Sequence, residues 1–135
     1  MRNSVEYNIL NAVSATGAGN AIFVEDFRHK EIAISVAGMG AGDTITVKIQ
    51  GSSSEDAPGF DAAKTASNEW DYIQMVDLED ASTIDGDTGI TFADSNDLRK
   101  FAVNVDGLKW VTANITAITD TTSTSATVTI VLFND

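Results

Sequence analysis

The sequence contains no cysteine and only one proline in its 135 residues. Without cysteine the chain forms no disulfide and offers no thiolate ligand to a metal. It also lacks an apolar run approaching the roughly 20 residues that a membrane-spanning helix needs. Its first residues, MRNSVEYNIL, show no basic segment followed by an apolar run, so we expect no signal peptide and no membrane partner.

Basic residues are scarce. Eight lysines and arginines face 20 acidic residues, which gives a net charge of -12 and a pI of about 4.1. A field of this sign repels the phosphates of nucleic acids, so we expect no direct nucleic-acid partner. The same charge suits a basic protein surface or a divalent cation, and it keeps the chain in solution.

The chain has a single histidine, His29, which lies between Arg28 and Lys30. Nucleophilic catalysis needs a base beside its nucleophile, and no nucleophile motif accompanies this histidine. We therefore expect no enzyme. The three neighbouring residues instead predict a contact with an acidic protein surface, which a second copy of this chain would supply.

The sequence is rich in runs where apolar and polar residues alternate with a period of two, the pattern of strands that bury one face. The clearest are Glu31–Ala37, Thr44–Gln50 and three consecutive runs within Leu98–Phe133. We predict one hairpin through the glycine-rich loop Gly38–Asp43 and another through the Asp106-Gly107 turn.

About eight or nine such short strands, with no helical period, predict an all-β fold. We expect an antiparallel β-sandwich, with a jelly-roll arrangement as one form of it. Residues 1–13 form either an N-terminal arm or a first strand, with Val5, Tyr7 and Ile9 on one side. Residues 14–135 form a single β-sandwich domain.

The sequence predicts one more strand, and the last strand contains an exception to the alternation. Glu69–Leu78 is a predicted strand with Trp70, Tyr72, Val76 and Leu78 on one face. In the last strand, Val131 and Phe133 are apolar on the side that should face water. We predict that this side is covered, either by another part of the chain or by another chain.

An acidic turn suggests a calcium site. Asp85 and Asp87 stand two residues apart, which suits a hard cation that takes several oxygen ligands. The loop is not an EF-hand, because its sixth position is Ile90 and its twelfth is Asn96. Further ligands would come from Asp77, Glu79 and Asp80. Apart from this Ca²⁺ hypothesis, the sequence indicates no cofactor.

Three aromatic residues, Trp70, Tyr72 and Trp110, could stack on a sugar ring if they were exposed. Aromatic residues on strands also serve as core or interface residues. A carbohydrate-binding β-sandwich module is therefore an alternative from a different functional class.

The run RKFAVNVDGLKWVTANIT, which closes on ATVTIVLFN, together with VKIQGSSS (47–54) and EWDYIQMVDLED (69–80), is similar to small virion structural proteins of tailed bacteriophages. These are β-sandwich proteins of the capsid decoration or cement type. Tail, head-tail connector and fibre proteins share the same features, so a structural module of that kind is a second interpretation.

The resemblance implies an accessory protein of the capsid surface that is made in the host cytoplasm. Its partners would be the major capsid protein and copies of itself, often as a trimer. It implies no catalytic residue. On this interpretation residues 1–13 and the C-terminal strand carry most of the contacts, and removal of residues 1–12 weakens capsid attachment while the sandwich stays folded.

Overall fold

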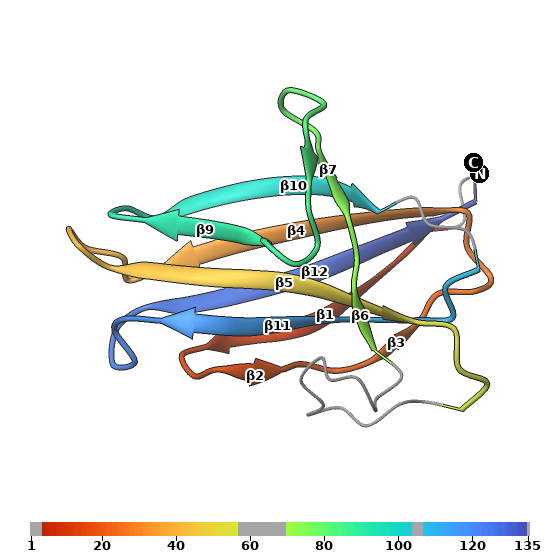
Figure 1. Cartoon of the computed structure of the whole chain (residues 1–135), viewed down its shortest axis with the longest axis horizontal. Coiled ribbons are helices and arrows are strands. Elements are labelled where there is room, and N and C mark those ends of the chain that lie inside the picture. The colour runs from red at the N-terminus through yellow and green to blue at the C-terminus, as the bar shows by residue number, and fades with distance from the viewer. Residues whose placement is uncertain (1–3, 57–69, 104–106, 135) are drawn as a thin grey trace.

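The computed structural model describes residues 4–56, 70–103 and 107–134, and in these ranges the chain is all β. Its strands form two antiparallel sheets packed as a β-sandwich, which confirms the predicted fold class (Figure 1). No helix of the described residues is long and apolar enough to cross a membrane. The strands are β1 (Ser4–Val13), β2 (Gly17–Ala18), β3 (Ile22–Phe23), β4 (His29–Ala37), β5 (Thr44–Ser52), β6 (Asp71–Tyr72), β7 (Met75–Asp77), β8 (Thr83–Ile84), β9 (Ile90–Ala93), β10 (Asp97–Val103), β11 (Trp110–Ile118) and β12 (Ser125–Phe133).

The strands pair in the nested order of a jelly roll. The first strand pairs with the last, β1 with β12, and the pairing then moves inward: β2 and β3 with β11, β4 with β10, and β5 with β9. The first sheet has the order β1-β12-β4-β10-β7-β8. The second sheet has the order β2-β11-β5-β6, with β3 beside β11 and β9 beside β5. Strands β6 to β8 are thus an insertion between the fourth and fifth strands of the roll.

Both predicted hairpins are wrong. β4 lies in the first sheet and β5 in the second, and β10 and β11 are divided in the same way. Alternation identifies the buried face of a strand, but both sheets bury a face in the same core, so the pattern does not identify the neighbouring strand. The loop Gly38–Asp43 therefore crosses between the sheets. Of the second turn, Asp106 lies outside the described residues.

The inward faces predicted from the alternation are confirmed along β4, β5, β11 and β12. Their apolar residues form one core with Phe101 of β10, and each large side chain buried there contributes about 1.5–3 kcal/mol. One predicted inward residue, Ala117, is exposed, because the register shifts between Ile115 and Ala117. The buried apolar residues of these five strands are Ile32, Ile34, Val36, Ile45, Val47, Ile49, Phe101, Val103, Val111, Ala113, Ile115, Ala126, Val128, Ile130 and Leu132.

β1 is the first strand of the roll, because it pairs with β12 along its length. Val5, Tyr7 and Ile9 lie on one side, as predicted, because Val5 and Tyr7 stand opposite the buried Leu132 and Ile130 and Ile9 is buried in the core. A register shift between Asn8 and Leu10 places both Ile9 and Leu10 in the core. We therefore expect removal of residues 1–12 to destabilise the sandwich rather than leave it folded.

The predicted strand Glu69–Leu78 is two strands in different sheets, with Glu69 itself outside the described residues. β6 pairs with β5 of the second sheet, whereas β7 pairs with β10 of the first. The crossing changes which side chains face inward. Trp70 is buried at 3% exposure, but Leu78 is 50% exposed, so these two residues do not share a face.

The turn between β11 and β12 depends on the carboxylate of Asp120. Its Oδ1 accepts the backbone N–H of Thr122 at 2.9 Å and that of Ser123 at 3.2 Å. The Thr122 hydroxyl also donates to it at 2.7 Å. These hydrogen bonds, the Thr122 hydroxyl first, hold the pKa of Asp120 below its ordinary value of 3.8.

We expect this carboxylate to stabilise the fold above the ordinary pKa and to lose that effect as the pH falls through the lowered pKa. Asp120→Ala should then lower the melting temperature at pH 7 but make little difference near pH ~2. Thermal melts at both pH values check this. Asp120→Asn is the control, because its amide oxygen accepts the same bonds without titrating; an equal loss at both pH values in Asp120→Ala would contradict the expectation.

Candidate binding surface

The apolar residues at the end of β12 lie on the outer face of the first sheet, the face turned away from the second sheet. Cross-strand partners share a face, and Phe133 stands opposite His29 while Val131 stands opposite Glu31. The rings of Phe133 and His29 stack with centroids 5.0 Å apart and planes at 24°. The histidine and the apolar end of the C-terminal strand, which are far apart in the sequence, therefore belong to one surface.

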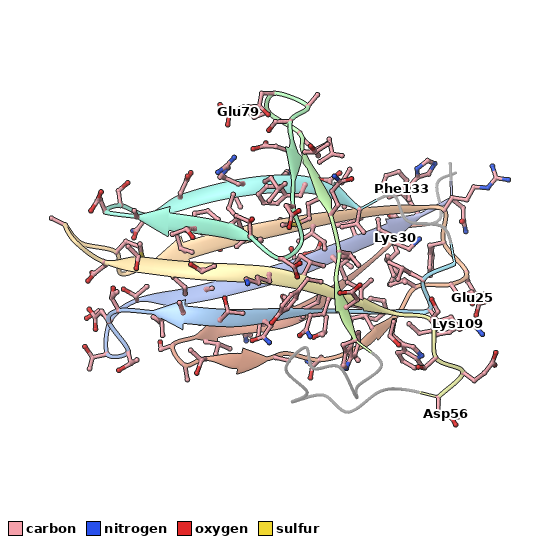
Figure 2. All side chains as sticks on the ribbon, in the orientation of Figure 1. Glu25, Lys30, Asp56, Glu79, Lys109 and Phe133 are labelled. Carbon is pink, nitrogen blue, oxygen red and sulfur yellow. The ribbon has the colours of Figure 1, made fainter. Side chains whose placement is uncertain are left out.

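A groove of about 290 Å³ opens beside this ring stack. It spans β12, β4 and β10 and reaches the residue that follows β7. Figure 2 places Phe133 and Lys30 at the end of the sandwich where β12 ends. The groove, called the outer-face groove below, is lined by His29, Lys30, Glu31, Leu78, Ala102, Val103 and Phe133.

The predicted cationic residues differ in what they can contact. Arg28 is exposed, and its backbone N–H donates to Asn134 Oδ1 at 3.0 Å. Lys30 is only 6% exposed, and its Nζ donates to the Phe27 carbonyl at 3.0 Å. Arg28 and His29 therefore remain at the surface, whereas the Lys30 ammonium is held inside the chain.

The N-terminal residues predicted for the same interface lie elsewhere. Val5 and Tyr7 stand opposite the buried Leu132 and Ile130, so their side chains point to the inner side of the sheet. Val5 packs against the core, while Tyr7 is 43% exposed at the sheet edge. The structure thus brings together Arg28, His29, Val131 and Phe133, and it separates them from Val5, Tyr7 and the buried Ile9.

Four residues that line the groove had not been predicted for the interface: Glu31, Leu78, Ala102 and Val103. Ala102 lines it because β10 pairs with β4 and sets this residue opposite Glu31. Leu78 lines it because the insertion crosses from the second sheet to the first. No local feature of the sequence indicates either of these placements. Ala102 is an alanine on the side of its strand that was expected to face water. Leu78 fits the alternation of a single strand Glu69–Leu78, which the structure divides into two.

Two solved structures have the same fold. The SPBc2 prophage-derived protein YomS aligns over 99% of this chain and 96% of its own, with a TM-score of 0.63 and 12% identity. The PBSX exported protein XepA aligns over 98% of this chain with a TM-score of 0.66 and 17% identity, and this chain spans only 38% of XepA. At such identities the likeness shows the fold alone. No family model and no curated protein matches the sequence.

None of the aromatic residues considered for sugar stacking is fully exposed to solvent. Trp70 is buried. The indole of Trp110 is half-buried, donates to the Ser54 carbonyl at 3.1 Å and packs edge-on against Phe23 at 5.2 Å. The Lys48 ammonium covers the ring of Tyr72 at 4.8 Å. This arrangement does not favour the carbohydrate-binding interpretation.

The acids of the calcium hypothesis cap turns in the structure. Asp85 Oδ1 accepts the backbone N–H groups of Asp87 at 2.8 Å and of Thr88 at 3.3 Å. Asp77 is ion-paired with Arg99, which removes it from the ligands considered. The described part of the chain contains no group of three histidine, cysteine, aspartate or glutamate residues placed to hold a metal.

The Ca²⁺ hypothesis at Asp85 and Asp87 stays a prediction, and chelation tests it. If calcium binds the folded chain at about 100 times its Kd, it adds ~2.7 kcal/mol of stability. EDTA should then lower the melting temperature of the wild type and leave that of Asp87→Asn unchanged. Equal melting of the wild type with EDTA and with added calcium would contradict the hypothesis.

Proposed function

We propose that this chain is a non-enzymatic structural protein of a phage virion, which binds the capsid surface as a decoration or cement protein. The observation that carries the proposal is the outer-face groove with its flanking apolar residues, which the described residues leave open. An uncovered apolar surface of this kind is typical of a protein contact. The two phage-derived fold neighbours support the phage origin, and YomS matches the chain along its whole length.

The chemistry of the described residues supports a role without catalysis. His29, the only histidine of the chain, stacks on the apolar ring of Phe133. The buried carboxylate of Asp77 is bound by Arg99 and by the backbone N–H of Glu79. His29 and Asp77 are thus engaged in ring packing and in an ion pair.

The proposed partners are the major capsid protein and further copies of this chain, assembled as a trimer. We assign the shell contact to the outer edge of β1, which has no neighbouring strand among the described residues. An edge strand can accept a strand from another chain through main-chain hydrogen bonds. The register shifts of β1 begin at Asn8, so the regular stretch is Ser4–Asn8.

Tyr7→Lys should weaken attachment to the shell about tenfold, because a lysine at a sheet edge opposes strand addition. Purified protein is mixed with shells that lack it, and the bound fraction is measured after sedimentation. Melting should change little, since Tyr7 is 43% exposed. Phe23→Lys is the matched control at a similarly exposed aromatic residue, and undiminished binding of Tyr7→Lys would argue against the assigned edge.

A second candidate is a structural module of the tail, the connector or a fibre. The observation that favours it is XepA, where the same fold occupies 38% of a longer chain and so serves as one part of a larger protein. Quantifying the protein in separated heads and tails of the virion decides between the two. Recovery with heads supports the decoration role, recovery with tails supports the second candidate, and absence from the virion overturns both.

A further inference from the structure

We propose that the outer-face groove receives Leu98 of a second copy, so that copies join head to tail. The inference deepens the proposed function, because it names the contact through which copies of a decoration protein associate. It depends on a groove at one end of the first sheet, an exposed leucine at the other, and opposite charges beside them.

Leu98 is an apolar residue that the fold itself does not explain. It is 59% exposed, more than any other large hydrophobic residue among the described ones. It stands opposite Ser35 on the outer face, and Ser35 stands opposite Thr127. A leucine in this row of small polar residues contributes little to its own chain, so contact with another molecule accounts for it best.

The outer-face groove has the size and lining that a leucine side chain needs. Its volume of about 290 Å³ is just below the roughly 300–1,000 Å³ of small-molecule sites. Phe133, Ala102 and Leu78 provide apolar walls. A branched aliphatic side chain would fit into this space against the apolar walls and be removed from water there.

Among the charges beside the two features, Asp97 and Arg28 form a complementary pair, while Glu31 also lines the groove. Leu98 follows the exposed Asp97, whose Oδ1 accepts the Leu98 backbone N–H at 2.8 Å. Arg28 is exposed beside the groove. The ion pairs seen in the described residues involve Arg99 and Lys109 and do not include Arg28. A docked Leu98 would bring Asp97 toward Arg28. Repulsion between two chains of net charge -12 is screened beyond about 8 Å at physiological ionic strength.

The contact is one-way rather than reciprocal. Lys100 is exposed and lies between Leu98 and Ala102 along β10. A two-fold pair with both leucines docked would set Lys100 of one copy against Lys100 of the other, and opposed like charges are destabilising. A one-way contact avoids this and, where its rotation closes, forms a ring such as the proposed trimer.

A knob-and-groove mixture tests the direction of the contact. Leu98→Ser removes the knob, and Ala102→Trp fills the groove. Each variant alone should associate about tenfold more weakly than the wild type, which light scattering on a sizing column measures across a concentration series. An equal mixture should give a 1:1 heterodimer, because one intact knob and one intact groove remain. Phe23→Ser, at an exposed residue of the second sheet, should associate like the wild type.

A charge exchange tests the polar part of the contact. Arg28→Glu and Asp97→Arg should each weaken association, and the double variant should restore it, because every interface then carries the reversed pair. Circular dichroism verifies that all variants are folded. A monomeric wild type, unchanged association of Leu98→Ser, or a double variant no better than the singles would overturn the inference.

The outcomes separate this inference from the proposed function. A wild type that is monomeric at every concentration but present on virion heads overturns the head-to-tail contact and leaves the decoration role standing. An oligomer that depends on Leu98 but is absent from virions does the reverse.

Discussion

Arg99→Met is expected to lower the free energy of unfolding by about 3 kcal/mol, because it leaves a buried carboxylate without its cation. Asp77 is 2% exposed and ion-paired with the guanidinium of Arg99, whose side chain is 29% exposed. The other carboxylate oxygen accepts the Glu79 backbone N–H at 2.9 Å. The pair fixes β7, and with it the insertion, to β10. Urea denaturation followed by tryptophan fluorescence measures the loss.

Two controls isolate the buried charge as the cause. The double variant Asp77→Asn with Arg99→Met has no buried carboxylate charge, so it should regain most of the stability that Arg99→Met loses. Lys109→Met breaks the pair with Glu55, whose side chain is 90% exposed, and should cost much less stability than Arg99→Met, because exposed ion pairs contribute little. If Arg99→Met costs no more than Lys109→Met, the ion pair is not what holds the insertion.

The inward faces of the strands were predictable because burial is a local property of the alternation. Ile45, Val47 and Ile49 had to face a core whichever strand lay beside them. The neighbours were not predictable, because a jelly roll pairs strands that are distant in the sequence, as β1 with β12. Contacts of this kind depend on how the loops cross, and a glycine-rich loop closes a hairpin or crosses between sheets equally well.

The candidate surface was predictable in part for the same reason. Val131 and Phe133 broke the alternation, which marked their side of β12 as unusual. Ala102 obeys the alternation, and only its place opposite Glu31 brings it to the groove. Leu78 was assigned to the wrong face because nothing in EWDYIQMVDLED marks the crossing between the sheets. Ile9 follows the alternation of Val5 and Tyr7, and only the register shift beside it, which also buries Leu10, was not predicted.

Gly38→Ala is expected to lower the free energy of unfolding by about 3 kcal/mol. The substitution tests the loop between β4 and β5, which crosses between the two sheets where a hairpin had been predicted. Gly38 has a φ of 70°, in the left-handed region where a side chain costs ~1–2 kcal/mol. A Cβ there would also stand 1.9 Å from the Ser123 carbonyl oxygen, and relieving such overpacking costs typically ~1–3 kcal/mol. The β4–β5 crossing must therefore move away from the β11–β12 loop.

Gly42→Ala separates the two costs within the same loop. Gly42 has a φ of 86°, and a Cβ there would meet nothing within 4 Å, so only the ~1–2 kcal/mol of backbone strain applies. The difference between the two variants in urea denaturation measures the contact between the two crossings. In a hairpin of β4 and β5 Gly38 would not approach the β11–β12 loop, so equal losses in both variants would speak for that pairing and against the jelly roll.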